Sequence, residues 1–565
     1  MAKDNKESEI EKLKAENERL KRELKKKKKY GLVWEEKPEE VVEMCKKKLP
    51  VLKEVKNKEI ITDKNKPVNL LIEGDNYHAL SVLNYTHAKK VDVIYIDPPY
   101  NTGARNWKYN NNYVDIEDSF RHSKWLSFME KRLLLAKNLL KNIGIICITI
   151  DENEQAQLKL LCDEIFGENN YLGTVCIRNN PSGRTRKSEI SLQHEYAIFY
   201  SKNKNQKGIS PFYVTPENKT HNYKQNEDGS WYEKRNLRRG RKREEKPKRF
   251  FPIFVHPKNF EISIINKPNF VKVLPVNEFG QELTWDREKT QIEELYKKNE
   301  IWCEKTKKGY QIFFKFRPNL EIGESPKSLW IDPKYSSREH GIRVLTDMFG
   351  ESPFEYPKSI YAVIDCIKTM NSSKEITVLD FFAGSGTTGQ AVLELNKEDG
   401  GNRQFILCTN NENNICTDVC YPRIEKVIKG YKNLKGQKVA GLGGNLKYFK
   451  TDFVNYDEPT DRNKIKLTQQ AIEMLCVKEG TFEKVIDNER FKIFKNSSHY
   501  TGIIWNQVAI PTFKKAIKDI KGKFSVYIFS LGDETFDDEF KDVKQEVELS
   551  PIPEAILRVY RRIFK

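Results

Sequence analysis

Four consecutive residues, Asp97-Pro98-Pro99-Tyr100, combine a carboxylate, two backbone carbonyls and an aromatic ring. The prolines have a fixed φ and no N–H group, so they hold their neighbours in one geometry and leave carbonyl oxygens free to accept hydrogen bonds. Asp97 and the Pro98 carbonyl could therefore accept the two N–H donors of an exocyclic amino group, while Tyr100 stacks on the ring that carries it. This pattern indicates a socket for the amino group of adenine or cytosine. The alternative is a Pro-rich turn that ends a strand, with Asp97 as a solvated cap.

A second segment, residues 380–389, reads Asp-Phe-Phe-Ala-Gly-Ser-Gly-Thr-Thr-Gly. Its small residues would let the backbone approach a ligand at the start of a helix. Gly384 and Gly389 have the spacing of a P-loop, but Gln390 and Ala391 stand where that loop requires Lys and Ser or Thr. The segment therefore lacks the lysine and the metal-binding hydroxyl with which a P-loop binds phosphate. Alone, the turn is a weak signal for a nucleotide-like cofactor, and a tight strand-to-helix connection is the alternative.

Both segments follow apolar runs that predict β-strands. Continuous β-branched runs that alternate with helical periodicity favour parallel strands covered by helices on both faces. In such sheets, ligands bind at the carboxyl ends of the strands, which is where Asp97 and the Gly-rich turn are expected. The expected strands are residues 68–72, 91–96, 143–150, 376–382 and 405–408, with helices around 126–140 and up to residue 395.

Composition narrows the class of protein. The 565 residues predict three or four domains, and the net charge of +18 favours a polyanionic partner such as nucleic acid. No apolar run is long enough for a membrane helix and the N-terminus has no secretory signal, so we expect a cytoplasmic protein with no membrane partner. The ten cysteines lack zinc spacing and are expected to be reduced, with no metal site.

Together the two segments resemble the signatures of amino-methyltransferases that use S-adenosylmethionine, Asp-Pro-Pro-Tyr and Phe-x-Gly-x-Gly. Their order along the chain is that of the β class of DNA amino-methyltransferases. The resemblance implies a Rossmann-like α/β sheet with permuted motif order, and it implies N6 of adenine as the target, because cytosine amino enzymes of the family usually carry Ser where Asp97 stands. It assigns catalysis to Asp97, Pro98, Pro99 and Tyr100, and cofactor binding to Asp75, Asp380, Phe382, Ala383, Gly384, Ser385, Gly386, Thr387, Thr388, Lys358 and Glu412.

Some of these assignments depend on short matches. Asp75 lies in a Gly-Asp turn whose Asp contacts the cofactor adenine in the family, and Lys358 ends a segment that packs near the methionine end. The family commonly has an acidic residue for the cofactor ribose after the strand that follows the Gly motif. Here that strand leads into residues 409–412, so Glu412 or Asn410 is expected to serve.

Within the class, the chain resembles the modification subunit of type III restriction systems from about residue 30 to residue 565. This resemblance implies double-stranded DNA as substrate, a homodimer, and a separate restriction subunit that supplies nuclease and translocase activity. The matching segments are 30–34, 97–103, 236–240, 251–253 and 552–557.

The segment between the two motifs is the expected target recognition domain. Residues 233–249 carry ten basic and three acidic side chains, which suits contacts to phosphates and guanine edges, although a solvated loop is the alternative for any one arginine. The residues predicted to bind DNA are Arg235, Arg238, Arg239, Arg241, Lys242 and Arg243. The predicted parts are an N-terminal helix or short coiled coil (1–29), two halves of the methyltransferase domain (30–201 and 331–435), the recognition domain (202–330) and a C-terminal α+β domain (436–565).

Other functions remain open from the residues. A noncatalytic DNA-specificity subunit and an N4-cytosine methyltransferase are the alternatives. An RNA enzyme is less favoured, because such enzymes typically place Asn before the two prolines. Carbon-5 cytosine methylation uses a Pro-Cys nucleophile, and the sequence contains no Pro-Cys pair.

Overall fold

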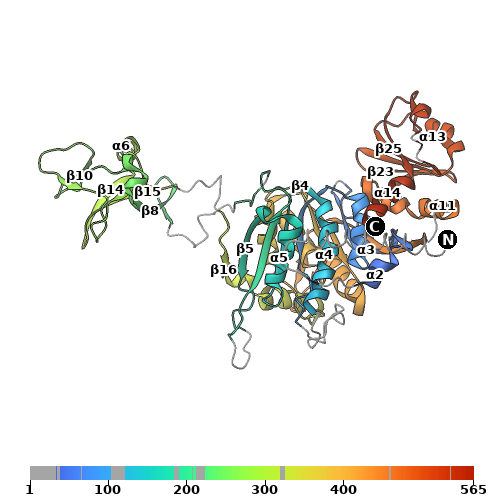
Figure 1. Cartoon of the computed structure of the whole chain (residues 1–565), viewed down its shortest axis with the longest axis horizontal. Coiled ribbons are helices and arrows are strands. Elements are labelled where there is room, and N and C mark those ends of the chain that lie inside the picture. The colour runs from blue at the N-terminus through green and yellow to red at the C-terminus, as the bar shows by residue number, and fades with distance from the viewer. Residues whose placement is uncertain are drawn as a thin grey trace, which may run out of the picture. The chain divides into compact units, whose positions relative to one another are not determined.

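The computed structural model describes residues 34, 38–64, 66–102, 121–183, 190–206, 208–211, 223–317, 325–456, 460–532, 534 and 536–564. The predicted N-terminal helix lies outside these residues. The chain divides into a larger unit, residues 1–210 and 327–565, and an inserted unit, residues 211–326 (Figure 1). The inserted unit is shorter at both ends than the expected 202–330.

The larger unit is built on one ten-stranded mixed sheet, in agreement with the expected α/β class. From β21 to β4 every neighbouring pair of strands is parallel, while β1, β6 and β5 are joined by antiparallel pairings. The order is β1 (Lys48–Glu54), β21 (Asn445–Asn455), β2 (Val68–Glu73), β18 (Gln404–Thr409), β17 (Thr377–Asp380), β3 (Val91–Ile96), β4 (Leu140–Ile150), β6 (Glu195–Ser201), β5 (Tyr171–Ile177) and β16 (Leu329–Trp330).

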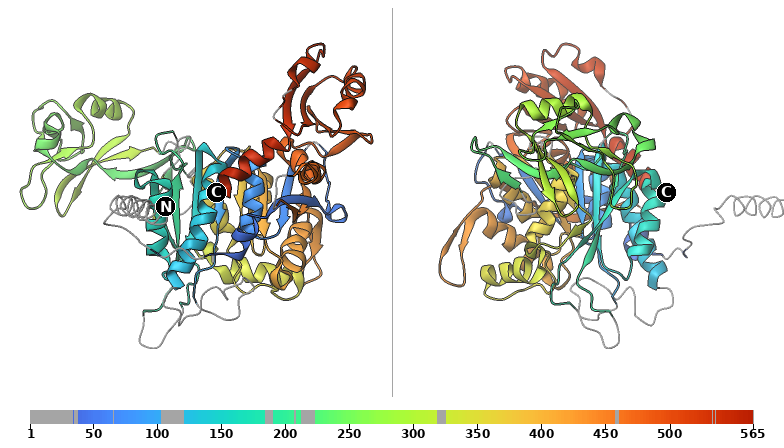
Figure 2. Two further views of the ribbon diagram at one scale, coloured as in Figure 1. Left: turned by 45° about the vertical axis from the view of Figure 1, so that its right-hand side comes forward. Right: turned by 90° about the vertical axis from the view of Figure 1, so that its left-hand side faces the viewer.

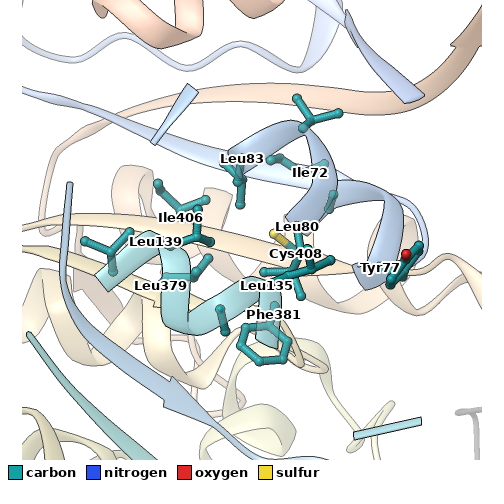
Figure 3. Close-up of a cluster of buried hydrophobic side chains, with 14 of the residues drawn as sticks. Ile72, Tyr77, Leu80, Leu83, Leu135, Leu139, Leu379, Phe381, Ile406 and Cys408 are labelled. Carbon is teal, nitrogen blue, oxygen red and sulfur yellow. The ribbon is translucent and has the colours of Figure 1, made fainter. Parts of the chain in front are cut away.

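Helices cover both faces of this sheet (Figures 1 and 2). Every residue of β3 is buried, as the continuous apolar run predicts for a central parallel strand. Figure 3 shows part of the core, where Leu80 and Leu135 from two helices pack toward Leu379 and Ile406 of the sheet. One face carries α3 (Asn76–Thr86), α4 (Arg121–Leu139) and α5 (Gln155–Phe166), and the other carries α8 (Ile360–Met370), α9 (Thr387–Asp399) and α10 (Tyr421–Lys429).

The pairing of β17 with β3 positions the two motifs. Val378 lies opposite Val93, and Leu379 lies opposite Ile94, in a parallel register. The carboxyl ends of the two strands therefore lie side by side. The loop of Asp97 to Tyr100 and the Gly-rich turn, which are far apart in the sequence, therefore leave the sheet at the same edge.

The expected start of a C-terminal domain at residue 436 is wrong, because β21 belongs to the main sheet and pairs with β1 and β2. A separate five-stranded sheet follows, and Tyr560 of the last helix donates a hydrogen bond to the Pro50 carbonyl of β1. Its strands are β22 (Glu483–Asp487), β23 (Phe491–Lys495), β24 (His499–Ile504), β25 (Lys523–Phe529) and β26 (Glu546–Ile552), with helices α11 (Asp461–Gln470), α12 (Ile472–Glu479), α13 (Ile510–Ile517) and α14 (Glu554–Ile563). Smaller elements of the larger unit are α2 (Glu40–Met44), α7 (Arg343–Phe349), β19 (Gly430–Lys432) and β20 (Lys438–Ala440).

The inserted unit is rich in β-structure, as the sequence indicates, and has its own core around Leu237, Trp285 and Phe314. Across the described part of the chain, no helix has the length and apolar character needed to cross a membrane. The inserted unit contains a four-stranded sheet in the order β14 (Ile301–Thr306), β15 (Gly309–Phe316), β8 (Trp231–Asn236) and β7 (Tyr223–Gln225). A second sheet pairs β13 (Leu283–Trp285) with β9 (Arg238–Lys242), and a third has the order β11 (Ile262–Ser263), β10 (Ile253–Val255) and β12 (Val271–Val273). Helix α6 (Lys289–Lys297) belongs to the same unit.

Candidate active site

Asp97 begins the loop after β3, and three neighbouring groups orient its carboxylate. The Thr149 hydroxyl, from the end of β4, and the Tyr100 hydroxyl each donate a hydrogen bond to Oδ1 over 2.7 Å. The Lys358 ammonium, from the segment before α8, lies 3.1 Å from the same oxygen. The carboxylate is therefore held in one orientation by side chains from three parts of the chain.

The rest of the motif is fixed as well. The buried Trp125 of α4 donates from its indole nitrogen to the Pro99 carbonyl over 2.7 Å. Asn101, which follows Tyr100, has a φ of 56° and donates its side-chain amide to the buried Glu154, which also lies 2.7 Å from His122 Nδ1. These contacts hold the loop on both sides of Tyr100, as a socket for a rigid ring requires.

Lys358 lies in the middle of this cluster. Glu195, the first residue of β6, is 2% exposed, and its Oε2 accepts hydrogen bonds from Lys358 over 2.5 Å and from Asn179 over 2.7 Å. Burial alone would lower the pKa of Lys358, but the carboxylates of Asp97 and Glu195 outweigh burial and raise it above its usual value. The ammonium is thus charged and faces Asp97 and Tyr100.

The Gly-rich turn is stiffened from within by Asp380, the last residue of β17. Its Oδ1 accepts from the Phe382 N–H over 2.9 Å, and its Oδ2 accepts from the Thr388 hydroxyl over 2.5 Å. Gly386 has a φ of +80°, which other residues rarely adopt, and a Cβ at this position would lie 3.2 Å from the Cys420 sulfur. The turn therefore requires glycine here and leads directly into the N-terminus of α9.

A buried arginine supports the turn from α10. Arg423 is 0% exposed and donates to the Ser385 hydroxyl over 3.0 Å, to the Thr387 hydroxyl over 2.8 Å and to Gln390 over 2.9 Å. Burial lowers its pKa to about 10. Sequence reasoning assigned no role to Arg423, because nothing in the spacing places α10 against the turn.

The predicted Gly-Asp turn is linked to the Gly-rich turn through side chains. Asp75 caps α3 by accepting from the Tyr77 N–H over 2.7 Å, and it lies 3.5 Å from the buried Arg132. Arg132 also donates to Asn76 over 2.5 Å, and Asn76 donates to the Phe381 carbonyl over 3.1 Å. The two turns, which follow β2 and β17, are thus linked at the carboxyl ends of the strands.

The position expected to bind the cofactor ribose follows β18, which pairs with β2. The Gly74 N–H donates to the Thr409 carbonyl over 2.9 Å, so the loop after β2 is joined to the end of β18. Among the described residues, the Asn410 side-chain oxygen is buried with no hydrogen-bond partner. A buried acceptor of this kind suits a ligand hydroxyl, and the assignment of the ribose to Glu412 or Asn410 stays a prediction.

These features fit the cofactor that the sequence resemblance implies. The Gly-rich turn offers backbone at a helix start, the Gly-Asp turn lies beside it, and Asn410 offers an unused acceptor. The Lys358 ammonium contacts Asp97, Tyr100 and Glu195, and its expected role near the methionine end of the cofactor stays a prediction. The sequence analysis assigned no role to Thr149 or Glu195. The sequence signal that could have indicated them is their position at strand ends, because Thr149 lies near the end of β4 and Glu195 begins β6.

The buried carboxyl of Asp380 predicts a pH-dependent stability. Burial raises its pKa from 3.8 to about 7, against the opposing hydrogen bonds from Thr388 and Phe382. The folded state therefore binds this proton more tightly than the unfolded chain does, and stability should fall as the pH rises from about 4 to about 7. We expect Asp380→Asn, which keeps an acceptor for the Phe382 N–H, to raise the melting temperature at pH 8 but not at pH 4. Equal shifts in thermal denaturation at both pH values would contradict this explanation.

The basic residues predicted to bind DNA lie on β8, on β9 and directly after β9. Arg241 and Lys242 are exposed, and Arg238 donates to the Val276 carbonyl. The other three arginines form ion pairs of 2.6–2.9 Å inside the inserted unit, so part of their charge is already balanced. These pairs join Arg235 to Glu233, Arg239 to Asp286 and Arg243 to Glu282.

Comparison with known proteins places both motifs in one family. A sequence model described as DNA methylase (N6_N4_Mtase) matches residues 91–419. The Mod subunit of the type III restriction-modification enzyme EcoPI of Escherichia phage P1 is 35% identical over 380 residues, which cover 61% of this chain and 58% of that protein. The type II methyltransferase M.KpnI of Klebsiella pneumoniae is 31% identical over 352 residues, which cover 62% of this chain and 82% of that protein.

A further relative shows the same limit of coverage. The Mod subunit of the type III enzyme StyLTI of Salmonella typhimurium is 31% identical over 409 residues, which cover 67% of this chain and 58% of that protein. The chain thus spans 58% of the length of each of these two Mod subunits.

Proposed function

Because the chain belongs to the DNA methylase family, we propose that it transfers a methyl group from S-adenosylmethionine to the N6 amino group of adenine in duplex DNA. The observation that carries this proposal is the rigid Asp97 carboxylate beside the Gly-rich turn, on adjacent strands of one sheet. The order of the two motifs along the chain supports the β class.

When bound, the cofactor supplies the methyl group, and the residues of the chain prepare the acceptor. Asp97 and the Pro98 carbonyl accept hydrogen bonds from the amino group, which aims the nitrogen lone pair at the methyl carbon. The Pro99 carbonyl is already engaged by Trp125, so Pro98 supplies the second acceptor. Positioning and preorganised electrostatics therefore provide most of the catalysis.

The target base has to leave the duplex to reach this socket. Extrusion of a base costs a few kcal/mol, and stacking on Tyr100 together with phosphate contacts would offset that cost. The net charge of +18 supports binding to DNA phosphates.

The similarity to Mod subunits supports a role in a type III restriction-modification system. In that role, the protein would act as a homodimer with a separate restriction subunit that supplies nuclease and translocase activity. The inserted unit, residues 211–326, would be the target recognition domain.

Single-molecule sequencing of DNA from cells that express the protein tests the proposal. We expect N6-methyladenine at one sequence motif with the wild type and none with Asp97→Ala. Methylation of cytosine N4 would overturn the choice of base, and the absence of any modified base with a folded wild-type protein would favour a noncatalytic specificity subunit.

The exposed pair Arg241 and Lys242 gives a separate prediction for DNA binding. If both contact phosphates, Arg241→Gln/Lys242→Gln should reduce the slope of log affinity against log salt by about 1.8, at about 0.9 per contact. Fluorescence anisotropy with a duplex at several salt concentrations measures this slope. The matched control Lys432→Gln/Lys435→Gln removes the same charge from the exposed hairpin of β19 and β20. An equal loss of slope in both variants would show a general charge effect and contradict a contact at β9.

A further inference from the structure

The Lys358 ammonium is held by three neighbouring groups of the site. They are Glu195 Oε2 at 2.5 Å, Asp97 Oδ1 at 3.1 Å and the Tyr100 hydroxyl oxygen. A lysine ammonium has three donors and no acceptor. Hydrogen bonds to Glu195 and Tyr100 and the ion pair with Asp97 therefore all direct the ammonium toward the Asp97–Tyr100 loop.

The hydroxyl of Tyr100 extends this arrangement. It accepts from Lys358 and donates to Asp97 over 2.7 Å. Burial and the charges of Asp97 and Glu195 raise the pKa of Tyr100 well above its usual value, so the hydroxyl remains a donor. Lys358 thus contacts Asp97 both directly and through Tyr100.

Glu195 holds the lysine in this place. Its carboxylate is buried at the start of β6, and Asn179, which follows β5, donates to the same oxygen that binds Lys358. An isolated buried ammonium is costly, whereas a paired and hydrogen-bonded one is tolerated. Glu195 therefore keeps the lysine charged and directed toward the catalytic motif.

We propose that Lys358 and Glu195 are positioning residues for the Asp97–Tyr100 socket, with Glu195 acting through Lys358 and through its own 3.2 Å contact with the Tyr100 hydroxyl, and that Lys358 is not a ligand of the cofactor. This inference rests on the proposed methyl transfer. We expect the two residues to affect the rate of the chemical step, because Lys358 and Glu195 set the orientation of Asp97 and Tyr100 before the amino group arrives.

The test separates cofactor affinity from the rate of methyl transfer. Lys358→Met removes the charge and keeps a long side chain, and Glu195→Gln keeps an acceptor for Asn179 but removes the counter-charge. For each variant and for the double variant, isothermal titration with S-adenosylmethionine gives the Kd, and single-turnover transfer from labelled cofactor to an unmethylated duplex that carries the target motif gives the rate. Lys368→Met serves as control, because Lys368 of α8 forms an ion pair with Glu398 at the surface.

We expect Lys358→Met to lower the single-turnover rate about 10²-fold, with a Kd within about threefold of the wild type. The double variant should lose less rate than the two single losses combined, because Glu195 and Lys358 contact each other and hold the same Tyr100 hydroxyl. A Kd raised tenfold or more by Lys358→Met would make Lys358 a cofactor ligand and overturn the inference, and so would an unchanged rate or additive losses in the double variant. If Lys358→Met does not fold, Glu195→Gln alone decides by the same two readouts. Absence of transfer by the wild type would instead contradict the proposed function.

Discussion

Asp97→Ala is expected to lower the single-turnover rate of methyl transfer by about 10³-fold or more and to leave the Kd for S-adenosylmethionine nearly unchanged. Two hydroxyl donors and the Lys358 ammonium orient the carboxylate. Its loss removes the group that aligns the amino nitrogen, so the effect falls on the chemical step. Rapid-quench measurement with enzyme in excess over DNA isolates that step.

Two controls make the Asp97 result specific. Asp519→Ala removes an exposed carboxylate after α13 and should retain the wild-type rate. Thermal denaturation of Asp97→Ala should give a melting temperature close to that of the wild type. A folded Asp97→Ala that still methylates DNA at a substantial rate would refute the catalytic assignment.

The parts of the fold that the sequence predicts well are those with a strong local pattern. The continuous apolar run of residues 91–96 became β3 with the same bounds, and the runs at 68–72 and 405–408 became β2 and β18. The Gly-rich turn could be predicted because its own backbone requires glycine. Gly386 has a φ of +80° and packs closely against its neighbours. Each of these features is encoded within a few residues.

The rest of the site depends on contacts between distant residues. Lys358 and Glu195 are 163 positions apart, and they meet because β6 runs antiparallel beside β4. Hydrophobic periodicity does not report strand order, so no local signal connects them. The same reason explains β21, which joins the main sheet after a hairpin and was expected to belong to a C-terminal domain.

Tyr100 gives the second large expected effect, because its ring and its hydroxyl have separable roles. The hydroxyl bonds to Asp97, which sequence reasoning did not foresee, while the ring was predicted to stack on the target base. Stacking of a base on an aromatic side chain contributes about 1–3 kcal/mol, and a hydrogen bond to a charged group contributes about 1.5–3 kcal/mol. Tyr100→Phe should therefore lower the rate about tenfold, and Tyr100→Ala about 10³-fold.

A fluorescent base at the target distinguishes the two losses. In a duplex with 2-aminopurine at the methylated position, stacking on the ring quenches the emission of the extruded base. Tyr100→Phe should keep the wild-type emission, because the ring remains, whereas Tyr100→Ala should give brighter emission. Equal rates for the two variants would show that the hydroxyl alone matters, and the ring would then have no part in holding the base.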